Sequence, residues 1–342
     1  MKIMDCTLRD GANVVGDGFS AELTTIILRA LTENNVPIIE IGNAKGLGAF
    51  EISNSVRALT DEEYLILAQP FLAKSEFGMF LNAKRFRRKN VELAAKYGFN
   101  FLRIGADAGD CAISEDAIRC VKENGMKVYY ALMKAYLSSP EELAEEAHIL
   151  QEMGVNVITI MDSAGTMWPQ DAAAYTRALK SVVNIPIGFH GHNNMHMALS
   201  NCVAATNAGA DIIDCCLLGM ARSAGNICTE AAVAVMNQQK IETGIDFYGL
   251  LHSLDEKLIP AMRQHGYHVP IEPLDLILGY SGCHSSFVPR FKQVADETQT
   301  DLYELIVQVS AINKKTPNEA LIRQFAEQLK KQKSTQTING KN

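Results

Sequence analysis

Residues 5–11, with the sequence DCTLRDG, open this chain, and residues 190–194, with the sequence HGHNN, follow much later. Residues i and i+2 of a strand point to the same face, so His190 and His192 can both reach one ion. Asp10 would add an oxygen ligand, and three protein ligands leave positions open for water or substrate. The two stretches therefore predict a divalent-cation site whose ligands come from distant strands, as in a barrel.

The pattern around these stretches predicts the fold. Short apolar runs alternate with amphipathic helical stretches, which indicates strands alternating with helices. The expected strands are Ile3–Leu8, Ile38–Ile41, Gly78–Leu81, Phe101–Ile104, Lys127–Leu132, Val157–Met161, Ile187–His190 and Ile212–Cys216. The expected helices are Ala21–Asn34, Asp61–Gln69, Arg87–Tyr97, Ser114–Asn124, Pro140–Met153, Asp171–Val183, Met195–Ala208 and Thr229–Gln238. Eight such units in about 240 residues match an α/β fold of the (β/α)8 TIM-barrel type. A doubly wound sheet would need a glycine-rich phosphate loop after its first strand, and this chain has none.

The alternation stops after about Thr243, which indicates a separate C-terminal part. Two further helices are expected, at Ile245–Gln264 and Leu302–Lys331, and prolines and glycines punctuate the stretch between them at Pro270, Pro273 and 279–282. The expected parts are a TIM-barrel catalytic domain at 1–242, a small helical C-terminal domain at 243–330 and a flexible polar tail at 331–342.

Composition excludes several classes of function. The 342 residues are 47% hydrophobic and 21% charged, which suits a soluble globular protein with a large core. A net charge of -7 without a basic stripe argues against a nucleic-acid partner, and no stretch approaches the ~20 apolar residues of a membrane span. The eight cysteines have no metal-binding or small-domain disulfide spacing, and no apolar signal segment begins the chain, so we expect a cytoplasmic protein.

The unusual polar residues fall at the carboxyl ends of the expected strands, where the active sites of such barrels lie. They are Arg9 and Asp10, Glu40, Lys134, Asp162 and Ser163, His190 and His192, and the loop at 219–226. Arg9 could grip an anionic substrate beside the metal. Glu40 lies in an apolar run, where an unpaired carboxylate would be costly, so we expect it to pair with Arg9 or with a water on the metal.

Three nearby residues have structural alternatives. Asp162 could cap the following turn or take part in the chemistry. Lys134 invites a Schiff-base mechanism, but a metal site in the same barrel would make that mechanism redundant. His196 is expected on a helix surface or beside the ligands rather than as a third imidazole ligand.

These motifs resemble those of the metallolyase TIM-barrel family. Residues 5–11 and 190–193 resemble its metal motifs, and the likeness extends over about residues 2–309. The chain most resembles the 4-hydroxy-2-oxovalerate aldolase (pyruvate aldolase) branch, while isopropylmalate synthase and hydroxymethylglutaryl-CoA lyase are more distant relatives. The stretches that resemble this branch are 208–214, 219–220, 224–226, 278–282 and 285–287.

The resemblance implies a carbon–carbon lyase that cleaves or forms a 4-hydroxy-2-oxoacid through a pyruvate-type enolate. It implies that Asp10, His190 and His192 bind a divalent ion, usually Mn²⁺, with Mg²⁺, Co²⁺ or Zn²⁺ as alternatives. It also implies that Arg9 binds the enolate oxygen and that Ser163 contacts the substrate carboxylate. Glu40 would support the metal-bound groups, and Asn226 would lie near the metal. The implied partners are a small 2-oxoacid and an aldehyde, further copies of the chain in a homo-oligomer, and an aldehyde dehydrogenase, although the tail lacks the ending typical of those aldolases.

Two positions depart from the aldolase pattern. The aldolases have a histidine where this chain has Asn13, and a tyrosine where it has His284. Both positions serve proton transfer at the substrate's 4-hydroxyl, and an imidazole can accept a proton at neutral pH whereas an amide cannot. Either His284 is the catalytic base, or the substrate and reaction differ.

Two other functions stay open. A Claisen-type acyl-CoA synthase or lyase would share the metal motif, but this chain lacks the acidic residue common just after the Arg-Asp-Gly of such synthases. A barrel that has lost its base could serve as a partner subunit. Asn13 is the one argument for that function, and the intact ligand set argues against it.

Overall fold

The structure is a computed structural model that describes residues 1–51, 58–267, 273–281, 283, 287–313 and 316–339. The chain forms two compact units, Met1–His268 and Val269–Asn342. The first contains every predicted site residue except His284, which lies outside the described residues.

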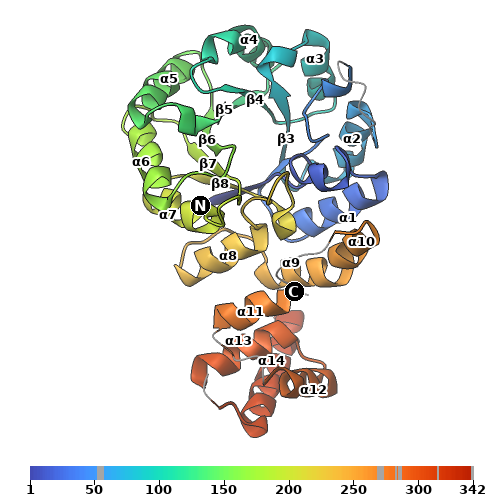
Figure 1. Cartoon of the computed structure of the whole chain (residues 1–342). Coiled ribbons are helices and arrows are strands. Elements are labelled where there is room, and N and C mark those ends of the chain that lie inside the picture. The colour runs from blue at the N-terminus through green and yellow to red at the C-terminus, as the bar shows by residue number, and fades with distance from the viewer. Residues whose placement is uncertain (52–57, 268–272, 282, 284–286, 314–315, 340–342) are drawn as a thin grey trace. The chain divides into compact units, whose positions relative to one another are not determined.

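The first unit is a closed barrel of eight parallel strands in chain order, which confirms the predicted TIM barrel (Figure 1). The strands are β1 (Lys2–Asp5), β2 (Ile38–Glu40), β3 (Glu76–Asn82), β4 (Phe101–Asp107), β5 (Lys127–Met133), β6 (Val157–Asp162), β7 (Ile187–Gly191) and β8 (Ile212–Cys215). The ring closes where β1 pairs with β8, with Ile3 opposite Ile213. Every residue of β2, β6, β7 and β8 is buried, because parallel strands in a barrel are covered on both faces.

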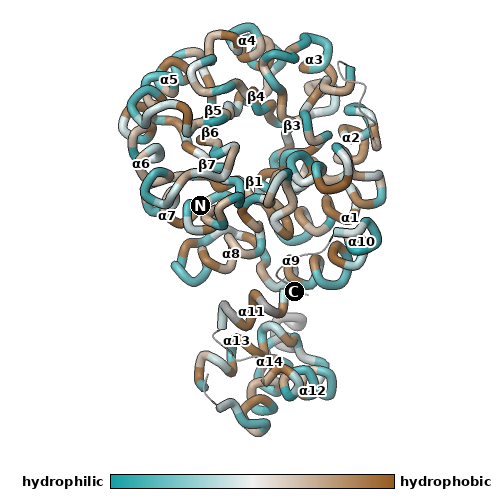
Figure 2. The backbone as a smooth tube through the Cα atoms, viewed as in Figure 1, coloured by the Kyte–Doolittle hydropathy of each residue, from teal (hydrophilic) through white to brown (hydrophobic). Residues whose placement is uncertain are grey.

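Helices surround the strands, and Figure 2 shows that they carry both hydrophilic and hydrophobic residues. They are α1 (Ala21–Thr32), α2 (Asp61–Ala68), α3 (Arg88–Lys96), α4 (Glu115–Glu123), α5 (Pro140–Glu152), α6 (Pro169–Lys180), α7 (Ala198–Asn207) and α8 (Thr229–Gln238). Three of them begin where a hydroxyl accepts a hydrogen bond from an amide of the first turn, at Ser20, Thr60 and Ser139. These N-caps fix the helix starts close to the predicted residues.

Apolar side chains fill the barrel interior next to the site. Met4, Cys6, Ile38, Phe101, Tyr129, Val157, Ile212 and Cys216 form one buried cluster. The rings of Phe101 and Tyr129 stack with centroids 4.2 Å apart. Phe101 also needs a glycine on the adjoining strand, since a Cβ at Gly78 would meet its ring at 2.3 Å. These side chains fill the barrel interior, so the barrel is a packed core and not an open pore.

Residues 243–267 belong to the barrel unit, so the first unit extends beyond the domain boundary expected at 242. The predicted helix at Ile245–Gln264 is present as α9 (Phe247–Ser253), a π-helical turn (Leu254–Leu258) and α10 (Ile259–Gln264). Asn34, after α1, donates to the Ser253 hydroxyl at 2.9 Å, and the leucines of α9 are fully buried. Burial of this apolar face against the barrel accounts for its place in the first unit.

The second unit is helical, with α11 (Pro273–Ser281), α12 (Val288–Thr298), α13 (Leu302–Ile312) and α14 (Glu319–Asn339). The expected single helix at Leu302–Lys331 is wrong, because a break separates α13 from α14. Pro317 disfavours helix at the residue before it, and the Asn318 side chain accepts from the Leu321 amide at 2.9 Å and starts α14. The stretch expected to be broken by Pro273 contains α11, since proline is tolerated in a first turn.

Helix α14 continues to Asn339, over most of the segment expected to be a flexible tail. Among the described residues, no helix is both long enough and apolar enough to cross a membrane.

Candidate metal centre

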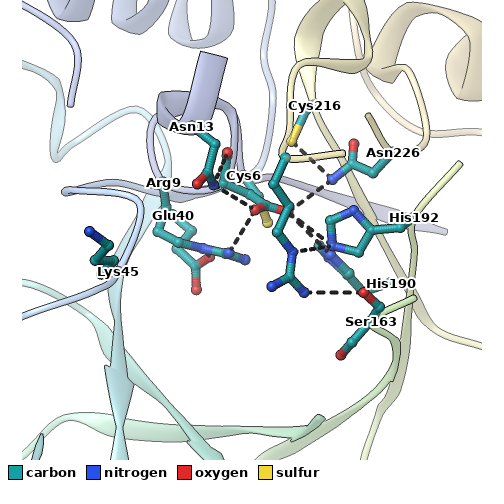
Figure 3. Close-up of polar contacts among 12 residues, drawn as sticks. Cys6, Arg9, Asn13, Glu40, Lys45, Ser163, His190, His192, Cys216 and Asn226 are labelled. Atoms are coloured by element: carbon teal, nitrogen blue, oxygen red, sulfur yellow. Dashed lines mark hydrogen bonds and ion pairs between the residues drawn. The ribbon is translucent and has the colours of Figure 1, made fainter. Parts of the chain in front are cut away.

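The predicted site residues that the structure describes converge at the carboxyl ends of the strands (Figure 3). Arg9 and Asp10 lie in the turn after β1, which forms because their amides donate to the Cys6 carbonyl at 3.0 and 2.8 Å. His190 lies within β7 and His192 directly follows it. A short antiparallel bridge joins His192 to Asn226 in the loop after β8. Ring closure thus brings residues from both ends of the barrel sequence to one place.

Asp10, His190 and His192 form a group that can hold a metal ion, with ligand atoms within 4.8 Å of one another. The Nε2 atoms of His190 and His192 lie 3.4 and 3.7 Å from the same oxygen, Oδ2 of Asp10. All three side chains are buried. One carboxylate and two imidazoles suit a divalent transition metal, and ligands about 2.0–2.2 Å from one ion lie at comparable mutual distances. The residues present therefore fit the predicted cation.

Hydrogen bonds orient both imidazoles so that Nε2 faces Asp10. Nδ1 of His192 lies 3.2 Å from the Gly225 carbonyl oxygen, which can only accept, so this nitrogen carries the proton. Nδ1 of His190 lies 3.1 Å from Oδ2 of Asp214. A metal-binding histidine usually donates its other N–H in this way, which leaves the Nε2 lone pair for the ion.

The electrostatics keep two of the ligands in their binding forms. Burial raises the pKa of the Asp10 carboxyl, but the charges of Arg9 and the two histidines outweigh burial and hold this pKa well below its usual range. Burial and the neighbouring His190 lower the pKa of His192 to about 4. At neutral pH Asp10 is therefore an anion and His192 a neutral imidazole, as metal binding requires.

A buried ion network supports the ligands and includes two residues that we did not predict, Arg103 and Asp214. Arg103 donates from Nε and Nη2 to the two oxygens of Glu40, at 2.7 and 2.6 Å, and forms an ion pair with Asp214. Glu40 also accepts from Nε of Arg9 at 2.6 Å, which confirms the predicted pairing of Glu40 with Arg9. Asp214 in turn holds His190. The network thus links Arg9 to His190, one of the candidate metal ligands.

We expect Arg103→Met to lower the free energy of unfolding by about 3–5 kcal/mol, because Glu40 and Asp214 would be left as buried charges with less compensation. Urea denaturation followed by circular dichroism measures the change. Arg88→Met is the matched control, since Arg88 pairs with Glu123 on the surface and such pairs contribute at most about 1 kcal/mol. Equal losses in the two variants would contradict this account of the network.

Unpartnered buried atoms lie beside the ligand set. Within the described part of the chain, Nη2 of Arg9 and Oδ1 of Asn226 have no hydrogen-bond partner. The Asn226 amide nitrogen donates to Oδ2 of Asp10 at 3.4 Å, so this side chain contacts a candidate ligand. Buried polar atoms are normally satisfied, and an anionic ligand beside the ion would satisfy Nη2 of Arg9.

Ser163 and Asn13 have distinct hydrogen-bonding roles. The Ser163 hydroxyl oxygen accepts from the Lys134 amide at 2.9 Å, which leaves the hydroxyl proton free to donate to a ligand. The Asn13 amide donates to the Asp10 carbonyl at 2.8 Å and to Oδ1 of Asp10 at 3.3 Å. Asn13 therefore holds the turn that contains Asp10, and its amide supplies no base.

The structure also shows which of the alternative roles Asp162, Lys134 and His196 have. Asp162 accepts from the amides of Thr166 and Met167 at 3.0 and 2.9 Å, so it caps the turn after β6. The Lys134 ammonium pairs with Asp107 at 2.8 Å, in a charged form that is not a nucleophile. His196 belongs to neither of the potential metal clusters found among the described residues.

A third residue that we did not predict individually, Arg222, lies in the loop after β8. Its Nε lies 3.4 Å from Nε2 of His192, and its Nη2 donates to the Ser163 carbonyl at 3.2 Å. Its position in the 219–226 loop indicates a site residue, because that loop follows the last strand of the barrel. The sequence around Asp214 indicates one too, since Asp214 is an acidic residue in an apolar run, as Glu40 is.

Comparison with known proteins gives consistent matches. The model of the HMGL-like family matches residues 1–256. The chain is 32% identical over 331 residues to the 4-hydroxy-2-oxovalerate aldolase of Carboxydothermus hydrogenoformans, covering 97% of this chain and 98% of the relative. It is 33% identical over 309 residues to the 4-hydroxy-2-oxovalerate aldolase of Geobacillus genomosp. 3, covering 90% and 91%.

A solved structure shares the fold. It is the carboxyl transferase domain of pyruvate carboxylase from Rhizobium etli, with a TM-score of 0.68 and 15% identity, covering 96% of this chain and 60% of that one. At this identity the likeness concerns the fold alone.

Proposed function

The chain belongs to the HMGL-like family, and from that membership we propose that it cleaves or forms a 4-hydroxy-2-oxoacid by way of a pyruvate-type enolate. The protein is a metal-dependent aldolase, a carbon–carbon lyase. The observation that carries the proposal is the convergence of Asp10, His190 and His192 beside the unpartnered Nη2 of Arg9. A cation site next to an anion-binding arginine suits a 2-oxoacid.

In this proposal Asp10, His190 and His192 are the metal ligands. A divalent ion held there would act as a Lewis acid that stabilises the negative charge of the enolate. We propose Mn²⁺ for this ion, and the mixed carboxylate and imidazole set also suits Mg²⁺, Co²⁺ or Zn²⁺.

Arg9 and Ser163 are proposed to bind the 2-oxoacid. Glu40 fixes the Arg9 side chain through Nε, so Nη2 is left to donate to the enolate oxygen. The Ser163 hydroxyl would donate to the substrate carboxylate, because its oxygen is already an acceptor. Asn226 would lie beside the ion. Glu40 acts as a positioning residue for Arg9.

Cleavage needs a base that removes the 4-hydroxyl proton. The C3–C4 bond then breaks, its electrons pass into the enolate, the aldehyde leaves and C3 takes up a proton. Burial raises the pKa of Glu40, but Arg103 and Arg9 outweigh burial and lower this pKa to about 2, so Glu40 is a poor base at neutral pH. Asn13 cannot accept the proton. We propose His284 as the base, on the family resemblance alone.

We expect the rate of the wild-type enzyme to fall as the pH falls through about 6.5, because His284 must be neutral to accept a proton. His284→Ala should cut kcat, roughly 10²-fold or more, and flatten this acidic limb. Asn13→Ala should change kcat less, since Asn13 holds a turn. The pH dependence of kcat, measured with saturating metal, checks the prediction, and an unchanged profile in His284→Ala would remove this residue as the base.

The proposed function is tested by pyruvate release from 4-hydroxy-2-oxovalerate without coenzyme A. We expect Mn²⁺-dependent release that EDTA stops and added Mn²⁺ restores. A Claisen-type enzyme of the same family would instead require an acyl-CoA. Turnover only with acyl-CoA substrates would overturn the aldolase proposal in favour of that alternative.

We also propose a cytoplasmic location and two protein partners. The eight cysteines are all free thiols, and seven of them are buried, which supports a reducing cytoplasm. A homo-oligomer and an aldehyde dehydrogenase partner are proposed from the family resemblance, and light scattering with and without a dehydrogenase tests both.

A further inference from the structure

A cavity of about 260 Å³ opens beside the metal centre, at the carboxyl ends of β3 to β6. Its polar lining consists of Asn82, Lys84, Asp107, Lys134, Ser163 and Arg222. The metal ligands and Arg9 do not line it, and Ser163 is the residue that it shares with the proposed 2-oxoacid site. The cavity is therefore a separate compartment that adjoins this site.

The lining is positively charged in an acidic protein. It contains three cations and one carboxylate, whereas the whole chain has a net charge of -7. The Lys134 ammonium lies 2.8 Å from Asp107, and the Lys84 ammonium lies 3.6 Å from Asp110 outside the lining. Clefts lined by one sign of charge concentrate ligands of the opposite sign. The cavity is thus suited to an anionic group.

Arg222 supplies the charge that is not neutralised. Among the described residues, no carboxylate lies within ion-pair distance of its guanidinium. One of its two contacts, at 3.4 Å, is to the Nε2 lone pair of His192, the same lone pair that the ion would take. The planar fork of a guanidinium matches carboxylate and phosphate oxygens. Arg222 is therefore available to an anion in the cavity.

The pyruvate half of the substrate does not need these cations. In the proposed function, on which this inference rests, the ion, Arg9 and Ser163 take the 2-oxo and carboxylate oxygens. The cavity also adjoins the proposed ion through Arg222, which contacts His192, so a group beyond C4 of a substrate held on the ion can reach it. 4-Hydroxy-2-oxovalerate, which appears in the names of the relatives, carries only a methyl group beyond C4. A methyl group would leave Arg222 without an anionic partner.

We propose that this cavity binds an anionic group at the far end of the aldehyde, so that the enzyme joins pyruvate to an acidic aldehyde. Carboxylate and phosphate share the chemistry that the lining recognises. In the synthetic direction, C3 of the enolate forms a bond with the aldehyde carbon, and the aldehyde oxygen takes up a proton to become the 4-hydroxyl. The anionic group takes no part in bond making and acts through binding.

The test compares aldehydes that differ in charge, using the full chain with Mn²⁺ and pyruvate. Succinic semialdehyde is compared with butanal, and glyceraldehyde 3-phosphate with glyceraldehyde, with the product measured by mass spectrometry. We expect at least one acidic aldehyde to exceed its neutral counterpart roughly 10- to 100-fold in kcat/KM, as for a hydrogen bond to a charged group. The pair with the larger ratio distinguishes carboxylate from phosphate. Equal kcat/KM values within both pairs would overturn the inference.

Lys134→Gln and Lys127→Gln are a matched pair of variants on β5. Lys134 follows the carboxyl end of the strand and Lys127 begins it, the two side chains are 46% and 56% exposed, and each pairs with one carboxylate. We expect Lys134→Gln to lower the preference for the acidic aldehyde roughly 10-fold, while Lys127→Gln leaves this preference unchanged. A rise in the KM for pyruvate in Lys134→Gln, without loss of the preference, would assign the cavity to pyruvate and overturn the inference.

Deuterium exchange separates this inference from the proposed function. Enolate formation exchanges the methyl protons of pyruvate in D₂O without any aldehyde, and proton NMR measures the exchange. Metal-dependent exchange without a preference for acidic aldehydes would overturn the inference alone. If neither exchange nor condensation occurred, the proposed function would fall, and the inference that rests on it would fall too.

Discussion

His190→Ala is expected to abolish metal-dependent turnover, with a loss on the order of 10³-fold or more, because a bound metal ion lowers the activation free energy by several kcal/mol. The variant removes one of two imidazoles that face Asp10, and it also releases Asp214 from its contact with the ring. Turnover with excess Mn²⁺ and metal content by mass spectrometry measure the effect. Metal content should fall together with activity, since two ligands remain.

The control for this variant is His148→Ala. His148 is an exposed residue of α5 outside the potential metal clusters of the described residues, so its loss should change neither quantity. Circular dichroism should show that His190→Ala keeps the barrel. Normal metal content and turnover in His190→Ala would refute the proposed ligand set.

Arg9→Lys is expected to lower kcat about 10²-fold or more while metal content stays near the wild-type value. Lysine keeps a positive charge beside Asp10 and Glu40. Lysine lacks the guanidinium group, which in Arg9 binds Glu40 through Nε and leaves Nη2 to donate to the enolate oxygen. The effect should therefore appear in kcat and in the deuterium exchange of pyruvate, because the interaction matters most when the enolate charge develops.

Arg88→Lys makes the same change in a surface arginine that pairs with Glu123, and it should leave kcat unaltered. A near-normal kcat in Arg9→Lys would exclude Arg9 from stabilising the enolate. Loss of metal in Arg9→Lys would instead show that this arginine chiefly supports Asp10.

The barrel could be predicted because its strands are short apolar runs that end in polar residues, as Ile38–Glu40 does. The convergence of His190 and His192 on Asp10 could be predicted because alternate residues of a strand share a face. Arg103 could not, since one arginine within Phe101–Asp107 looks like an outward-facing residue. Only ring closure shows that its guanidinium lies between Glu40 and Asp214.

The C-terminal helices were harder to predict for a local reason. A proline that begins a helix, as Pro273 does in α11, has the same sequence appearance as a proline in a loop. The break between α13 and α14 depends on one proline and one capping asparagine within an otherwise helical pattern. Such boundaries are decided by few residues, whereas the barrel repeats its pattern eight times.

The pairing of β1 with β8 has a consequence for synthesis on the ribosome. Lys2 pairs with Ile212, so the first strand must wait for the last one before the ring can close. Contacts this distant in sequence slow folding, and the waiting intermediate exposes unpaired strand edges. Asp10 and His190 also meet late, so a nascent chain that stops before β7 cannot assemble the proposed metal site. Nascent chains of this enzyme should therefore rely on chaperones until the ring closes.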